Sequence, residues 1–138
     1  MSLSFLDKSN YYRGLLVLAA KDRIVDRRER ELMLRWGKIL DFEQRFCEAA
    51  IDDLLDNAYI SHEPVIFSER EIAECFLHDA IRLALVDENL HPQELTWLES
   101  VAQANGLTQE WLDAEIQSAL KTKTPSDQPI RLDIQQHL

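Results

Sequence analysis

The chain has 138 residues, of which 46% are hydrophobic, and its formal net charge is −10. This length suits one domain with a buried core, and three glycines and four prolines are too few for an all-β protein rich in tight turns. No apolar run approaches the roughly 20 residues of a membrane helix, and the first residues lack the features of a signal peptide. We therefore expect a cytoplasmic protein in which Cys47 and Cys75 are reduced core thiols.

The charge is spread unevenly along the chain. Residues 1–40 carry nine Lys and Arg against five Asp and Glu, whereas residues 41–138 carry six against twenty. The overall charge repels nucleic acid and anionic membrane surfaces, so we expect neither nucleic-acid binding nor direct membrane insertion. The basic part suits an acidic protein partner, or the acidic part of a second copy in a homodimer.

The sequence repeats itself at a spacing of 65 residues. Each copy has a turn with an Asp, an aliphatic residue three places on and a Glu seven places on. These residues are Asp22, Val25 and Glu29 in the first copy and Asp87, Leu90 and Glu94 in the second. Apolar positions also match across three helical segments on either side of the turns, which predicts one three-helix unit used twice.

The expected fold is therefore an all-α bundle of about six helices, built from two pseudo-twofold three-helix repeats. The domain spans residues 1–120, with repeats at 9–56 and 68–120 and a connector at 57–67. The tail, residues 121–138, is too polar at its start to hold a core. Its last apolar residues suit packing onto the bundle or onto a neighbouring molecule, and the sequence does not decide between these.

In the first repeat, the helix after Asn10 is apolar on most sides, which is typical of a helix at the centre of a bundle. Gly14 costs about 1 kcal/mol there relative to Ala, so we expect it to permit close packing. The second helix starts at a capping box formed by Asp26 and Glu29. Its inward residues are Leu32, Met33, Trp36, Ile39 and Leu40, and those of the third helix are Phe46, Ala49, Ala50, Leu54 and Leu55.

In the second repeat, Ser68 and Glu71 form a second predicted capping box at the start of the fourth helix. The fifth helix starts at Pro92 and ends at Gly106, and Thr108 caps the sixth. Trp97 is expected at the edge of the inward face of the fifth helix. His78 lies on the polar side of the fourth, without the spacing of a metal site, and we expect it at the surface.

Catalytic motifs are absent, so we expect no enzymatic activity. The carboxylates of the two acidic turns are the only repeated polar feature and hence the only candidate site. One interpretation is purely structural: Glu29 and Glu94 cap helices, while Asp22 and Asp87 accept backbone N–H bonds. A separate feature is a run of arginines on the second helix, which suits a solvated face or a docking patch for a partner. These residues are Arg27, Arg28, Arg30 and Arg35.

The stretches Ala19–Glu29 and Leu83–Glu94, with the helix that ends at Leu107, resemble the tellurite-resistance TerB-like family. The same module is found at the N-terminus of membrane-anchored J-domain co-chaperones of the DjlA type. The resemblance covers about residues 9–120 and rests on short motifs that occur twice. It implies a pseudo-twofold all-α bundle in which the acidic turns meet near the axis.

The resemblance also implies a divalent cation, Ca²⁺, Mg²⁺, Mn²⁺ or Zn²⁺, as the cofactor of a stress-response module. Carried over by position, its ligands are Asp22, Asp26, Glu29, Asp87 and Glu94. The chain departs from the family pattern at Arg23 and Glu88, where Gly is usual, and this weakens the case for a tight metal loop. Arg23 also suits direct pairing with the carboxylates in place of a cation. The alternative function is a protein-interaction scaffold that docks through the arginines.

Overall fold

The computed structural model describes residues 4–19, 27–56, 63–85 and 90–121. These residues form six α-helices and no strand, which confirms the all-α prediction. The helices are α1 Phe5–Ala19, α2 Arg27–Ile39, α3 Gln44–Asp56, α4 Arg70–Ala84, α5 Pro92–Ala104 and α6 Gln109–Lys121. The predicted connector has no helix in its described part, residues 63–67.

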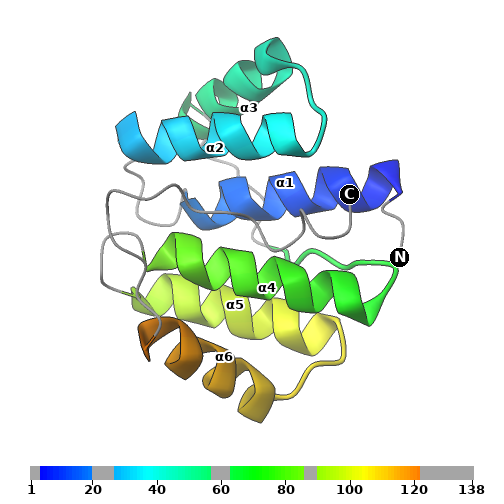
Figure 1. Cartoon of the computed structure of the whole chain (residues 1–138), viewed down its shortest axis with the longest axis vertical. Coiled ribbons are helices and arrows are strands. Elements are labelled where there is room, and N and C mark those ends of the chain that lie inside the picture. The colour runs from blue at the N-terminus through cyan, green and yellow to red at the C-terminus, as the bar shows by residue number, and fades with distance from the viewer. Residues whose placement is uncertain (1–3, 20–26, 57–62, 86–89, 122–138) are drawn as a thin grey trace.

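The bounds of the helices repeat along the chain. The helices α4, α5 and α6 begin and end 65 residues after α1, α2 and α3, the same spacing as in the sequence repeat. Figure 1 shows the helices stacked in the order α3, α2, α1, α4, α5 and α6 along the longest axis of the molecule. The first and fourth helices are therefore central, as the apolar character of α1 predicts. A twofold rotation that superposes the halves stays a prediction.

The contact between α1 and α4 depends on a glycine. A Cβ atom added at Gly14 would lie 2.5 Å from Cζ of Phe76, well inside van der Waals contact. The Phe76 ring has little room to move, because the rings of Tyr11, Phe67 and Trp97 pack around it with centroids 5.2 to 6.1 Å away. Gly14 thus permits the close approach of the two central helices, as the sequence predicts.

Both α2 and α5 end in the same hydrogen-bonded motif. At the end of α5, the N–H of Leu107 donates to the carbonyl of Ala102 at 2.8 Å, and Gly106 has a φ of +76°. At the end of α2, the N–H of Phe42 donates to the carbonyl of Gly37 at 2.8 Å, and Asp41 has a φ of +69°. These are Schellman ends, which require a left-handed residue and so favour glycine. The prediction that Gly106 ends α5 is confirmed.

The predicted capping box at Ser68 is wrong. The N-cap of α4 is Glu69, which makes no side-chain cap hydrogen bond. The Ser68 hydroxyl instead donates to Oδ2 of Asp7 at 2.5 Å, and its N–H donates to Oδ1 at 3.0 Å. A buried carboxylate in the first turn of α1 competes for this serine and ties the start of α1 to the start of α4. The predicted cap at Thr108 is confirmed, since its hydroxyl accepts the Trp111 N–H at 3.1 Å.

Several predicted side-chain positions also need correction. Phe46 and Ala49 are exposed, and α3 instead buries Cys47 and Ile51. Trp97, expected at an edge, is buried. The inward residues of α2 are largely confirmed, because Met33, Trp36 and Leu40 are buried and Ile39 is partly buried against them. The side chains of Leu32, Leu54 and Leu55 lie outside the described residues.

Candidate functional site

The helix ends that flank the two acidic turns lie at the same end of the molecule, on the left in Figure 1. The helices α1 and α4 run side by side in one direction, and α2 and α5 run back in the other. Two helix C-termini and two helix N-termini therefore lie on this side of the molecule, which we call the turn end. Their partial charges are about −0.5 and +0.5 each and act within about one turn of their own helix.

The predicted ligands fall mostly outside the described part of the chain. Asp22, Asp26 and Asp87 lie outside it altogether. Glu29 lies in the first turn of α2, but its side chain is also outside. Glu94, the third residue of α5, is the one predicted ligand whose side chain is described. Convergence of the five carboxylates therefore stays a prediction. Among the described residues there is no group of three or more side chains suited to hold a metal ion.

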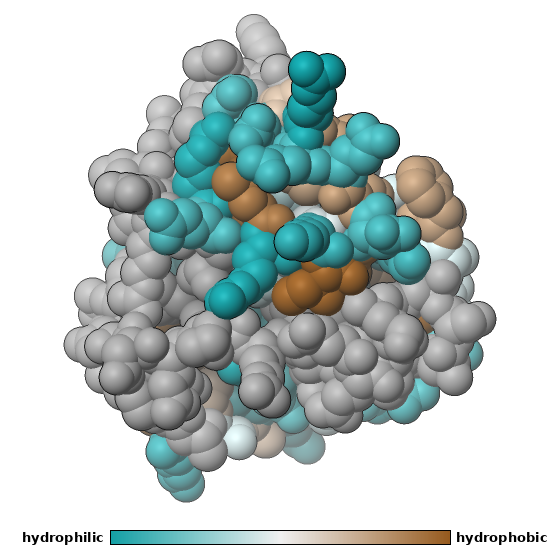
Figure 2. All heavy atoms as spheres, turned by 45° about the horizontal axis from the view of Figure 1, so that its top comes forward, coloured by the Kyte–Doolittle hydropathy of each residue, from teal (hydrophilic) through white to brown (hydrophobic). Residues whose placement is uncertain are grey.

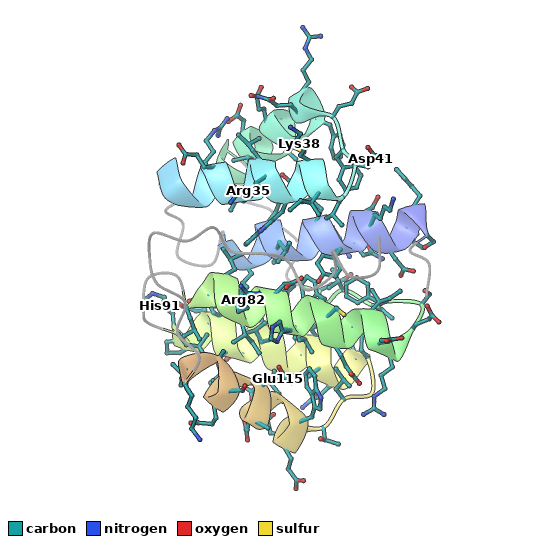
Figure 3. All side chains as sticks on the ribbon, viewed as in Figure 1. Arg35, Lys38, Asp41, Arg82, His91 and Glu115 are labelled. Atoms are coloured by element: carbon teal, nitrogen blue, oxygen red, sulfur yellow. The ribbon has the colours of Figure 1, made fainter. Side chains whose placement is uncertain are left out.

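The Glu94 carboxylate supports the start of α5. It is 7% exposed, and its Oε1 accepts the N–H of His91 at 3.1 Å. His91 is the N-cap residue, and Pro92 occupies the first helical position, where a missing N–H costs nothing. Figure 3 shows His91 at the turn end. The structural interpretation of Glu94 as a helix cap is confirmed for this residue, and its role as a metal ligand stays a prediction.

The predicted arginine patch is not one uniform surface. Arg30 is half-buried, and its Nη1 lies 3.0 Å from Oδ1 of Asp52 on α3. Arg35, five residues further along α2, is exposed, and Figure 3 shows it on that helix. The side chains of Arg27 and Arg28 lie outside the described residues. Figure 2 brings α2 and α3 forward and shows hydrophilic side chains around smaller apolar areas.

The sequence patterns did not predict two carboxylates that the structure buries. Asp7 is 2% exposed, and Asp79 on α4 is 1% exposed and accepts a hydrogen bond from the Tyr11 hydroxyl on α1. Burial raises the pKa of Asp7, but hydrogen bonds from Ser68 and Ser4 outweigh it, so its pKa lies below the ordinary 3.8. Both link the central helices. The feature of the sequence that marks each of these buried carboxylates is an Asp at an inward position of an apolar helix.

His78 is half-buried on α4. Its Nδ1 lies 3.2 Å from Oε2 of Glu115 on α6, so it joins two helices of the second half. The expectation that His78 lies at the surface is confirmed in part, because its side chain is 41% exposed and packs beside Glu115.

None of the described helices is long and apolar enough to cross a membrane. Comparison of the chain with protein-family models, curated proteins and solved structures finds no match.

Proposed function

We propose that this chain is a non-enzymatic binding module of the TerB-like kind, which associates with a divalent cation through its turn end in response to metal or oxyanion stress. One observation carries the proposal. The ends of α1, α2, α4 and α5 that flank the two acidic turns lie on the same side of the stack of helices. This arrangement favours convergence of carboxylates from segments 65 residues apart in the chain.

The chemistry of the proposed ligands fits a hard cation. Asp22, Asp26, Glu29 and Asp87 offer only carboxylate oxygens, and Ca²⁺ prefers about six to eight oxygen ligands. In Glu94, the fifth proposed ligand, one carboxylate oxygen already accepts a hydrogen bond from the His91 N–H. The main contribution of Glu94 is therefore to fix the start of α5. A bound cation supplies positive charge that offsets repulsion among the carboxylates. The protein supplies the helix ends that hold them.

The test is a titration of Ca²⁺, Mg²⁺, Mn²⁺ and Zn²⁺ while thermal unfolding is followed. An ion present at 100 times its dissociation constant should stabilise the folded chain by about 2.7 kcal/mol. Asp22→Asn combined with Asp87→Asn should abolish this shift. A matched control, Glu43→Gln with Glu110→Gln, removes two exposed carboxylates elsewhere and should preserve it. If no ion moves the unfolding midpoint of the wild-type chain, the proposed cation site is wrong.

A second candidate function is a protein-interaction scaffold that docks an acidic partner through α2. The exposed side chain of Arg35 favours it, whereas the contact of Arg30 with Asp52 leaves Arg30 less suited to a partner. Arg35→Glu should abolish capture of the partner from cell lysate at low salt, and Arg45→Glu, an exposed arginine on α3, should leave it unchanged. Equal capture by both variants would count against docking through α2.

A further inference from the structure

The side of the molecule opposite the turn end carries two exposed phenylalanines, with a partly buried phenylalanine between them. Phe5 begins α1, Phe42 lies between α2 and α3, and Phe46 lies in the first turn of α3. The ring centroids of Phe5 and Phe42 are 6.3 Å apart, and those of Phe42 and Phe46 are 5.4 Å apart, so the three rings are continuous. Phe5 is 76% exposed and Phe46 is 55% exposed. We call these three residues the aromatic patch.

The second half of the chain shows that the fold does not require this exposure. The first residue of α4, in the place that Phe5 has in α1, is Arg70, and it is exposed. The third residue of α6, in the place of Phe46, is Trp111, which is partly buried against the core. In the second half, the two matching positions are therefore occupied by a charged residue and by a residue that packs against the core. An exposed phenylalanine at both places in the first half is therefore a property of this surface and not a requirement of the fold.

The charges around the aromatic patch permit a second copy to approach. The whole chain carries −10, which repels another copy over most of the surface. The charged residues nearest in sequence to the patch and not fully buried are balanced, with three of each sign: Lys8, Lys38 and Arg45 against Asp41, Glu43 and Glu48. Figure 3 shows Lys38 and Asp41 toward the same end of α2. A twofold contact can therefore place basic side chains of one copy opposite acidic side chains of the other.

The area of the patch sets the strength of the association. A Phe side chain buries about 150 to 250 Å², so the exposed parts of Phe5 and Phe46 amount to roughly 250 Å² per copy. Two copies therefore bury roughly 500 Å² of this aromatic surface, less than the total of about 1,200 Å² at which standard specific interfaces begin. Such an interface is typical of weak, reversible association.

We propose that two copies of this chain form a weak twofold dimer through the aromatic patch. The inference does not depend on the proposed cation site, because the patch lies at the opposite end of the molecule. Dimerisation through the patch leaves both turn ends accessible and presents two of them in one particle. Two linked sites bind a multivalent partner more tightly than one site does.

The experiment is sedimentation velocity of the full chain over a wide concentration series without added metal. The wild-type chain should shift from monomer to dimer as concentration rises. Phe46→Glu and Phe5→Glu should each weaken the dimer at least about tenfold, because truncating or charging a central aromatic contact removes much of the binding energy. Leu120→Glu is the matched control, since Leu120 is 50% exposed on α6, outside the patch, and it should dimerise like the wild type.

Circular dichroism checks that each variant is folded, and Phe46→Ser replaces Phe46→Glu if the charge disturbs α3. The proposal is wrong if the wild-type chain stays monomeric at every concentration. This holds even if the aromatic patch then binds a different protein. A dimer that Phe46→Glu and Phe5→Glu leave intact, or that Leu120→Glu disrupts instead, also overturns it.

Discussion

At the scale of single residues, the most consequential side chain is the buried carboxylate of Asp7. It accepts hydrogen bonds from the N–H and hydroxyl of Ser68 and from the hydroxyl of Ser4, which also caps α1 by accepting the Asp7 N–H at 3.1 Å. Nothing in the spacing of apolar residues predicts that a serine 61 positions away will donate to it. Hydrogen bonds to a charged group contribute about 1.5 to 3 kcal/mol each, more than neutral ones.

We predict that Asp7→Ala lowers the free energy of unfolding by about 2 to 3 kcal/mol at neutral pH. The folded-state pKa of Asp7 lies below 3.8, so its stabilisation is complete above that pH and is lost as the pH falls through the lower folded-state pKa. Urea unfolding across pH should therefore show the wild type and the variant converging in acid. A difference that stays constant down to the lowest pH would contradict this account.

A second residue-scale prediction concerns the two left-handed helix ends. Gly106→Ala should destabilise the chain by about 1 kcal/mol, because a Cβ atom disfavours positive φ. Apart from Gly106 and its two chain neighbours, no heavy atom lies within 4 Å of the position of that Cβ atom, so the loss of stability reports backbone strain and not a steric clash. Asp41→Gly should stabilise the chain by a few tenths of a kcal/mol to about 1 kcal/mol. Thermal unfolding measures both, and a stabilising Gly106→Ala would contradict the assigned backbone conformation.

At the scale of the helices, the contact between α1 and α4 rests on the missing side chain of Gly14. An exposed alanine would favour the helix by about 1 kcal/mol over glycine, but here its Cβ atom would meet the Phe76 ring. We predict that Gly14→Ala destabilises the chain by about 1 to 3 kcal/mol, as overpacking in a core does. Gly14→Ala combined with Phe76→Leu should recover part of the loss in chemical denaturation. A stabilising Gly14→Ala would show that the helices separate without cost.

The sequence predicts the helices well and their side-chain environments less well. Pro92, Thr108 and Gly106 act within a few residues of where they stand, so local chemistry suffices to place helix ends. Phe46 recurs at helical spacing with other apolar residues, which predicts an inward position, but α3 buries Cys47 and Ile51 instead and leaves Phe46 exposed. Which side of a helix with several apolar residues packs on the core depends on its neighbouring helices, and periodicity does not contain that information.

At the scale of the whole molecule, the 65-residue spacing of the sequence reappears in the bounds of all six described helices. Short connections place consecutive helices of a unit side by side, and the two units meet through their first helices, α1 and α4. The geometry of the candidate site cannot be derived from the sequence in the same way. Whether carboxylates from Asp22 and Asp87 point toward one another depends on turn geometry, and the spacing of residues in the sequence does not fix it.

The most direct test of the turn end as a cation site is broadening of backbone amide NMR signals by paramagnetic Mn²⁺. The account predicts that substoichiometric Mn²⁺ broadens the signals of Leu90 and Glu94 together with those at the start of α2, and spares Phe5 and Phe46 at the opposite end. Asp22→Asn combined with Asp87→Asn should remove this selective broadening. Broadening that is absent, or that spreads evenly over exposed carboxylates such as Glu43 and Glu110, would contradict it.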